Sequence, residues 1–426
     1  MKNIFEYVGK YMMKWILIAT LVGIGGGLSA VALQKSIELT SELSKSVPLW
    51  IAPAIGGGLL SLIYIRDRSA AGFGTDRYIS TINLKKDQLE YKSSFTKLIS
   101  TAITLGFRGS GGVEGPMLVI GGGLSNGISK LPVFKNLLDK HDRRTLIICG
   151  AAGAIGAIFR SPLGGGIFVV EILYRSSLHY SDLFPAMLSS TMGFVVYSMI
   201  SKSTPLFNIP DYLPNVYNVP FFVLAAILAG ILSLIFMGVF SKIQNIFKKA
   251  PLRPIHPLIG GLLVGVILII VPKVSGTGTS IIQEMIDTVL PLSMLLALFI
   301  GKIIATSLTV ASGGSAGLVI PSLFIGAIAG NSVATIIGVG DIGLSSSLVI
   351  AGMAASLASV ANVPVAAAVM LVEMVGLRLG VPATLGSIIG YAIGHSQVIY
   401  GVTNPDQWQF EEMKKLRKKD VNKRKH

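Results

Sequence analysis

Long runs of apolar residues, separated by short polar segments, dominate the chain. A helix needs about 20 predominantly apolar residues to cross the hydrocarbon of a bilayer, and most of the runs reach that length. The pattern therefore predicts an all-α protein that crosses a membrane many times. In chain order the runs cover residues 12–33, 48–65, 97–128, 145–174, 183–201, 219–241, 257–272, 289–310, 316–339, 347–375 and 381–400.

Two apolar stretches, residues 97–128 and 302–330, contain glycine-rich interruptions. The first reads GFRGSGGVEGP over residues 106–116, and the second reads ASGGSAGLVIP over residues 311–321. Freed backbone groups inside a bilayer survive only where protein or a water-filled cavity supplies partners, so both runs are predicted to be broken helices. Proline is favoured in the first turn of a helix, which points both helix N-termini at the interruptions. Because these ends are positive, they favour an anion between them.

Sequence blocks from the first half recur in the second half, in the same order and at nearly constant separation. The pattern predicts two homologous halves, at about 12–215 and 216–405, in one transmembrane domain over residues 1–409. Transport proteins build midplane sites from paired broken helices of this kind. The matching blocks are Lys97–Leu105 with Lys302–Val310, Ser110–Gly112 with Ser312–Gly314, Pro116–Gly121 with Pro321–Gly326, and Gly150, Pro162 and Glu171 with Gly352, Pro364 and Glu373.

Composition and charge agree with a membrane protein. Of 426 residues, 51% are hydrophobic and 13% charged, and the net charge is +15. Much of the excess lies in basic clusters beside apolar runs, which the positive-inside rule explains better than nucleic-acid binding. The tail, residues 410–426, is strongly basic, so both termini are expected in the cytoplasm. With one cysteine and scattered histidines, no metal site and no cofactor are expected.

Several motifs carry a resemblance to a known family. Gly112-Val-Glu-Gly-Pro116 resembles the G-K/R-E-G-P motif of the CLC chloride channels and transporters, and Gly317–Pro321 resembles their G-x-F-x-P motif. The segment from Ala157 to Glu171 is similar to F-N-A-P-L-A-G…F-x-x-E, and Tyr400 stands where the family has its last-helix tyrosine. The resemblance implies a CLC-type fold with two inverted repeats of tilted, broken and re-entrant helices. It also implies a homodimer of the prokaryotic type, in a plasma membrane, without appended regulatory domains.

The resemblance supplies roles for individual residues. It implies that the Glu114 carboxylate is a gate, which occupies an anion site and leaves it when protonated. It implies an outer chloride site formed by the backbone amides of Val113, Glu114 and Gly115. The amides of Leu318 and Val319 and the Tyr400 hydroxyl would line a central one.

The sequence departs from the family's G-S-G-I-P motif, for which it has Gly72-Phe-Gly-Thr-Asp76. The phenyl ring of Phe73 offers no hydroxyl to an anion, so backbone amides near Phe73 and Gly74 are expected to serve instead. Thr75 or Asp76 is interpreted as a cap of the following helix. Selectivity among chloride, nitrate, bromide and fluoride stays open.

A second departure concerns proton coupling. Proton-coupled members commonly have two successive acids where this chain has Glu171-Ile172, and an isoleucine carries no proton. This favours uncoupled, channel-like passage of chloride gated by Glu114. Exchange of chloride for protons, with Glu114 as the outer carrier, is the alternative. An intramembrane enzyme is not expected, because the adjacent pair His395-Ser396 has no third group to orient it.

Two further pairs of residues occupy matching positions in the halves. Glu171 and Glu373 are interpreted as partners in helix-terminal hydrogen bonding rather than in transport. For Lys97, whose mate is Lys302, two interpretations stay open: a contribution to the positive potential of the pore, or extension of the side chain to the membrane interface.

Overall fold

The computed structural model describes residues 2–84, 89–132, 138–174, 179–201, 205–397 and 399–400. The basic tail predicted over residues 410–426 lies outside these ranges. Every regular element in the described chain is a helix. Eight of the described helices are long and apolar enough to cross a membrane.

The first half of the chain contains α1 to α9. Their bounds are α1 (Lys2–Ser44), α2 (Ala52–Arg66), α3 (Thr75–Leu84), α4 (Tyr91–Gly106), α5 (Glu114–Ile128), α7 (Lys140–Ile158), α8 (Pro162–Glu171) and α9 (Tyr180–Ser201). The second half contains α10 (Val219–Lys249), α11 (His256–Ile270), α12 (Thr279–Asp287), α13 (Leu292–Ala311), α14 (Val319–Ile337), α15 (Ile342–Ala361), α16 (Pro364–Val375) and α17 (Gly380–Gly394).

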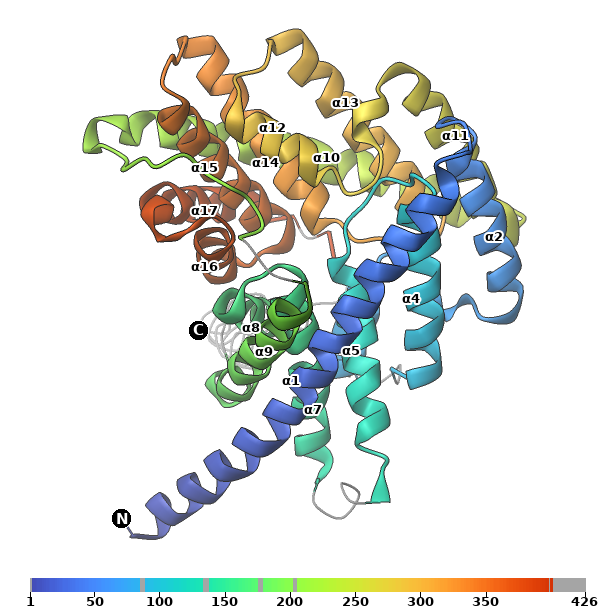
Figure 1. The fold of residues 1–426 in the computed structure, drawn as a ribbon, viewed down its shortest axis with the longest axis vertical. Helices are drawn as coiled ribbons and strands as arrows, with labels where there is room; N and C mark the ends of the chain where they lie inside the picture. Colours follow the sequence, from blue (N-terminus) through green and yellow to red (C-terminus); the bar gives the residue numbers. More distant parts are fainter. Residues whose placement is uncertain are drawn as a thin grey trace, which may run out of the picture.

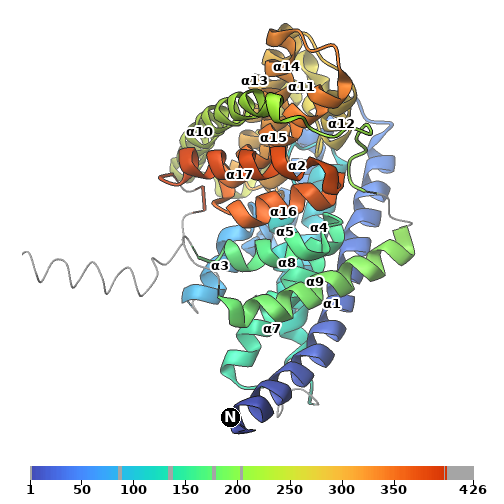
Figure 2. The same cartoon turned by 90° about the vertical axis from the view of Figure 1, so that its left-hand side faces the viewer.

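The helices cross at many angles instead of forming a parallel bundle (Figure 1). The long α1 runs obliquely across the first half and packs against α4, α7 and α9. Viewed from the side, α8, α9, α16 and α17 lie side by side (Figure 2). In the centre of the second half, α14 and α15 pack on each other and are almost entirely buried. This is the arrangement of tilted and broken helices that the sequence predicts.

Both predicted helix breaks are confirmed. The run over 97–128 divides into α4 and α5, and the run over 302–330 divides between α13 and α14. The runs over 145–174 and 347–375 are broken as well. They divide at Arg160 and Asn362, which both adopt left-handed φ angles of 55°. Pro162 and Pro364 then begin the new helices, α8 and α16.

Glycines let corresponding helix pairs of the two halves approach closely. A Cβ atom on Gly326 of α14 would lie 2.3 Å from the Gly352 carbonyl oxygen of α15. The matching pair in the first half, Gly121 of α5 and Gly150 of α7, leaves the same 2.3 Å. No side chain fits at such a distance, so the backbones pack directly. Small residues thus allow these helix pairs to pack closely.

The two glutamates at matching positions cap each other's helices. Glu171, at the end of α8, accepts hydrogen bonds from the Val365 and Ala366 amides at the start of α16, at 3.1 and 2.7 Å. Glu373 of α16 accepts from the Leu163 and Gly164 amides of α8 and from the Ser161 hydroxyl. Negative charge at helix N-termini is stabilising. The helix-terminal interpretation of this pair therefore agrees with the geometry.

Replacing Glu373 by alanine is expected to lower stability by about 2 kcal/mol, because the buried Ser161 hydroxyl and the amide donors at the start of α8 lose their acceptor. The measurement is the thermal unfolding midpoint of purified protein in detergent. Glu284→Ala is the matched control, since Glu284 makes an exposed ion pair with Lys273 that is expected to contribute under 1 kcal/mol. Equal midpoints for the two variants would contradict the capping role of Glu373.

Candidate functional site

The two helix breaks meet at a short antiparallel bridge between two glycines. The Gly112 amide donates to the Gly317 carbonyl at 2.7 Å, and the Gly317 amide donates to the Gly112 carbonyl at 2.6 Å. Gly112 lies between α4 and α5, and Gly317 lies between α13 and α14. Because one residue comes from each half, the bridge lies where the two repeats meet in the middle of the protein.

Hydroxyl groups around the bridge pair across the repeats in the same way. The Ser110 amide donates to Thr309 Oγ1 at 3.1 Å, and the Ser315 amide donates to Thr104 Oγ1 at 3.0 Å. These reciprocal bonds identify Ser315, not Ser312, as the counterpart of Ser110. The sequence match of Ser110–Gly112 with Ser312–Gly314 is thus wrong by three residues. With this correction, the counterpart of Glu114 in the second half is Val319.

Glu114 begins α5 and is fully buried. Its Oε1 atom accepts a hydrogen bond from the Val319 amide at 2.5 Å, at the start of α14. The amides of Leu318 and Ile320 also act on the carboxylate. A Cβ atom on Gly112 or Gly317 would lie 2.1 or 2.0 Å from a Glu114 oxygen, so the carboxylate occupies the space beside the bridge. The N-terminus of α14, in the second repeat, thus receives a negative charge from Glu114 of the first repeat.

The first turn of α3 packs against the start of α5. A Cβ atom on Gly115 would lie 2.0 Å from the Phe73 carbonyl oxygen and 3.0 Å from Thr75 Oγ1. Gly74 has a φ angle of 88°, which only glycine adopts without strain, and its Cα lies beside the Gly115 carbonyl and Val119. The structure therefore brings Phe73 and Gly74 next to Gly115, and the Phe73 ring packs edge to face against Phe240, with the ring centroids 6.0 Å apart.

Tyr400 completes the group. Its ring lies 5.9 Å from that of Phe73, and its hydroxyl is buried without a hydrogen-bond partner among the described residues. The groups that act on this hydroxyl are Glu114, Asp76 and the side chain of Thr75. The Oε2 atom of Glu114 is also buried and has no hydrogen-bond partner within the described ranges. Two buried polar atoms of the site, one on Glu114 and one on Tyr400, therefore lack hydrogen-bond partners among the described residues.

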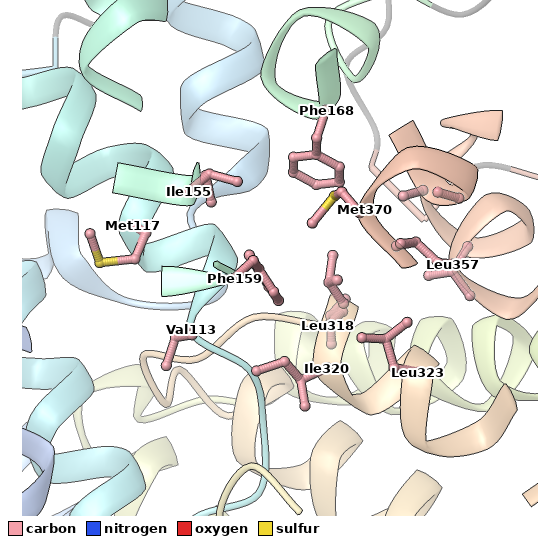
Figure 3. Close-up of a cluster of buried hydrophobic side chains, with 14 of the residues drawn as sticks. Val113, Met117, Ile155, Phe159, Phe168, Leu318, Ile320, Leu323, Leu357 and Met370 are labelled. Atoms are coloured by element: carbon pink, nitrogen blue, oxygen red, sulfur yellow. The ribbon is translucent and has the colours of Figure 1, made fainter. Parts of the chain in front are cut away.

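A cluster of buried apolar side chains lies beside the starts of α5 and α14 (Figure 3). Val113 and Leu318, which were predicted to contribute amides, direct their side chains into this cluster together with Phe159 and Ile320. Met117, Ile155, Phe168, Leu323, Leu357 and Met370 extend it, so that α5, α7, α8, α14, α15 and α16 all contribute. The cluster excludes water and strengthens the electrostatic attraction between the helix ends and any anion.

The paired lysines hold the turns that precede two short helices. Lys97 Nζ donates to the carbonyls of Ala70 and Gly72, at 2.9 and 2.5 Å, just before α3. Lys302 Nζ donates to the carbonyls of Val274, Gly276 and Thr277, just before α12. Both ammonium groups are buried, so the interpretation in which Lys97 extends to the membrane interface is wrong. Their role is to satisfy carbonyl groups beside the site.

Neither α3 nor α12 lies in an apolar run; a helix after Thr75 or Asp76 was expected from the capping interpretation, whereas α12 was not predicted. A signal was present: Gly72-Phe-Gly-Thr75 before α3 recurs as Gly276-Thr-Gly-Thr279 before α12. All four glycines have positive φ angles. This repeated turn marks the N-terminus of α3 at the site. Thr75 and Asp76, which had been interpreted as capping residues only, therefore belong to a helix end at the site.

His395 bonds to the Ala392 carbonyl of its own helix.

Residues 57–395 match the family model described as "Voltage gated chloride channel". An uncharacterised protein, MJ0305 of Methanocaldococcus jannaschii, is 33% identical over 402 residues, which cover 93% of this chain and 98% of that protein.

Two named relatives are more distant. The "Chloride/fluoride channel protein" of Pseudomonas syringae pv. tomato is 26% identical over 92% of this chain and 86% of its own length. The "H(+)/Cl(-) exchange transporter ClcA" of Vibrio cholerae is 26% identical over 90% of this chain and 88% of its own length. Among solved structures, a CLC-type fluoride/proton antiporter superposes with a TM-score of 0.80 at 20% identity, covering 93% of this chain and 98% of that one.

Proposed function

Since the chain belongs to the CLC family of voltage-gated chloride channels, whose members move anions across membranes, we propose that it exchanges chloride or a similar small anion for protons, with Glu114 as the outer proton carrier. The observation that carries this proposal is the buried Glu114 carboxylate bound to the α14 N-terminus at 2.5 Å. A free anion would take the same position, so carboxylate and anion compete for it.

Protonation decides this competition. An ionised carboxylate is held by the Val319 amide and by the positive end of α14. A neutral carboxyl group loses that charge interaction and can leave the cradle, which an anion then enters. Each cycle of this kind moves a proton on Glu114 in one direction and an anion in the other. Exchange thus follows because the Glu114 carboxylate either carries a proton or, when ionised, binds the N-terminus of α14.

The sequence alone favoured uncoupled conduction, because Ile172 stands where many exchangers have an acid. The relatives favour the alternative, since an H(+)/Cl(-) exchange transporter and a fluoride/proton antiporter are among them. One relative carries the name of a channel, and uncoupled conduction is therefore the competing hypothesis. Geometry supports exchange, because the gating carboxylate is fully buried in an apolar surrounding where protons arrive by transfer between groups.

The anion is proposed to pass between the amides of Val113, Glu114 and Gly115 on α5 and those of Leu318 and Val319 on α14. Backbone near Phe73 and Gly74 and the Tyr400 hydroxyl lie on its further route. The bound ion is chloride or a similar small anion, without another cofactor, and the protein acts as a transporter and not as an enzyme.

The test is the wild-type protein reconstituted in vesicles of phosphatidylethanolamine and phosphatidylglycerol, with a chloride gradient and equal pH on both sides. Electrodes follow chloride and protons together. Exchange is expected to move protons uphill, against the pH difference that builds up, in a fixed ratio to chloride. Chloride flux without proton movement would contradict exchange and support the channel hypothesis.

The protein is a multi-pass membrane protein, and we expect a prokaryotic plasma membrane with both termini in the cytoplasm. We expect a homodimer through the face of α8, α9, α16 and α17. Of these, α8 and α16 are too short to span a bilayer and expose Leu163 and Val365 beside their capped N-termini. Cover by a second copy would keep those helix ends out of lipid.

A further inference from the structure

Arg108 stands in the turn between α4 and α5, six residues before Glu114. In the segment 106–116 only Arg108 and Glu114 are charged, and the segment 311–321 between α13 and α14 has no charged residue. The Arg108 side chain is half-buried, and its guanidinium makes no hydrogen bond or ion pair within the described ranges. Lys97 and Lys302, in contrast, are bound to backbone carbonyls. The Arg108 charge is therefore not used by the fold.

The backbone at Arg108 has a conformation that suits glycine. Its φ angle is 66°, in the left-handed region that a residue with a Cβ atom adopts only at a cost in energy. When the repeats are aligned through Ser110 and Ser315, the counterpart of Arg108 is Gly313, with a φ angle of 110°. Glycine would therefore build the same turn with less strain. The turn does not explain the arginine, so its side chain needs another reason.

Hydrogen bonds along α1 show on which side of the membrane this turn lies. Near the start of α1, Lys14 pairs with Asp142 of α7, beside the basic residues that the positive-inside rule places in the cytoplasm. At its end, the Ser44 hydroxyl donates to the carbonyl of Gly106, the last residue of α4, at 2.7 Å. The helix between Lys14 and Ser44 is about 45 Å long, which exceeds the roughly 30 Å of bilayer hydrocarbon. Gly106 and the turn after it therefore lie at the outer side.

Other cations on this side are neutralised by acids. Lys45, the residue after Ser44, pairs with Glu42 at 2.6 Å. Lys273 pairs with Glu284 at 2.7 Å. It stands shortly before Gly276, whose carbonyl accepts a hydrogen bond from the Gly111 amide at 3.2 Å, so it also belongs to the surroundings of the turn. Arg108 thus brings an uncompensated positive charge to this side.

The turn also keeps Arg108 near the cradle that Glu114 occupies. Gly112 of the inter-repeat bridge follows four residues later, and because successive Cα atoms are about 3.8 Å apart, the two Cα atoms are at most about 15 Å apart. The Gly109 amide donates to the Thr104 carbonyl at 2.9 Å, which holds the turn against the end of α4. A positive charge beside the entrance of a site raises the local concentration of anions and the rate at which they enter.

We propose that Arg108 recruits anions at the outer entrance of the transport site, where its positive charge attracts chloride or a similar small anion that then enters the cradle beside the Gly112–Gly317 bridge. This rests on the anion passage proposed above, but not on its coupling to protons. Arg108 holds no anion permanently and carries no proton. It therefore sets the anion concentration at which transport saturates, and leaves the proton-to-chloride ratio unchanged.

The first test measures chloride flux into vesicles against external chloride for wild type and Arg108→Gln. The half-saturating chloride concentration is expected to rise about threefold in the variant, the size of effect that one solvent-screened charge produces. Arg108→Lys, which keeps the charge, should behave as wild type. The difference between wild type and Arg108→Gln should shrink when an impermeant salt raises the ionic strength, since salt screens exposed charges. Arg108→Gly should unfold at a temperature no lower than wild type, because glycine suits the φ angle of 66°.

The second test changes the charge at this position by chemical modification. Arg108→Cys is treated from outside with a membrane-impermeant thiosulfonate that carries either a quaternary ammonium or a sulfonate group. The ammonium should return the half-saturating concentration towards that of wild type, and the sulfonate should raise it further. Wild type should respond to neither reagent, because its one cysteine, Cys149, is fully buried. Ser46→Cys is the control for position, since Ser46 is an exposed residue just after α1, and either reagent should change its flux little.

The outcomes separate this inference from the proposed function. An unchanged half-saturating concentration in Arg108→Gln, or equal effects of the two reagents on Arg108→Cys, would show that the charge does not recruit anions. A lower unfolding temperature of Arg108→Gly would assign the side chain a structural role instead. If wild type moves chloride without protons, the exchange function is wrong, while the role of Arg108 is still decided by the same variants. If wild type moves no chloride, both proposals are wrong.

Discussion

Replacing Glu114 by glutamine is expected to stop proton movement while chloride still crosses. Glutamine has nearly the shape of glutamate but no ionisable carboxyl group, so it behaves like a permanently neutral gate. The proton flux should fall to the background of protein-free vesicles. The wild-type chloride flux should rise as pH falls, because protonation empties the cradle beside the Gly112–Gly317 bridge. In the variant this pH dependence should disappear.

The measurement is chloride and proton flux across a series of pH values, for wild type and Glu114→Gln. Glu42→Gln is the control, since Glu42 makes an exposed ion pair with Lys45 far along α1 and should behave as wild type. A Glu114→Gln variant that kept the wild-type dependence on pH would remove Glu114 from the gate. The same outcome would leave its bond to Val319 as a purely structural contact.

Replacing Gly326 by leucine is expected to prevent folding. A Cβ atom there would lie 2.3 Å from the Gly352 carbonyl oxygen, so α14 and α15 would have to move apart along their most buried contact. Overpacking of this kind costs about 3 kcal/mol or more, and it also displaces Val319 at the start of α14. Little monodisperse protein should be recovered, which size-exclusion chromatography of the detergent-solubilised membrane measures.

Gly238 provides the matched control for this substitution. It lies in α10, and a Cβ atom there would meet no other atom within 4 Å. Gly238→Leu should therefore be recovered at the wild-type level. Normal recovery of Gly326→Leu would contradict this prediction, because it would mean that α14 and α15 can move apart without loss of stability.

Much of the fold could be predicted because a bilayer imposes strong rules on sequence. The breaks between α4 and α5 and between α13 and α14 were visible as glycine-rich segments followed by Pro116 and Pro321. The breaks at Arg160 and Asn362 are harder to see in the sequence, because a single residue of left-handed conformation interrupts each apolar run. Hydrophobicity does not report such a change in backbone direction, and only the prolines that follow give a signal.

Most residues of the site could be predicted from the sequence, but the contacts between them could not. Glu114 and the two helix ends follow from charge, glycine and proline in one local segment. The hydrogen bond from Glu114 to Val319 joins residues far apart in the chain, and the correct alignment of Ser110 with Ser315 appears only when the repeats are seen together. Thr75 was assigned to capping alone because its packing against Gly115 depends on how α3 meets α5.

The reciprocal caps of α8 and α16 have a consequence for synthesis in the cell. Leu163 and its acceptor Glu373 are 210 residues apart, and ribosomes add about 5–20 residues per second, so α8 waits on the order of 10 to 40 s for its partner. During this interval the early half is inserted with bare amide ends inside lipid or the insertion machinery. Assembly of the two halves is therefore a late event, completed only when the last helices emerge.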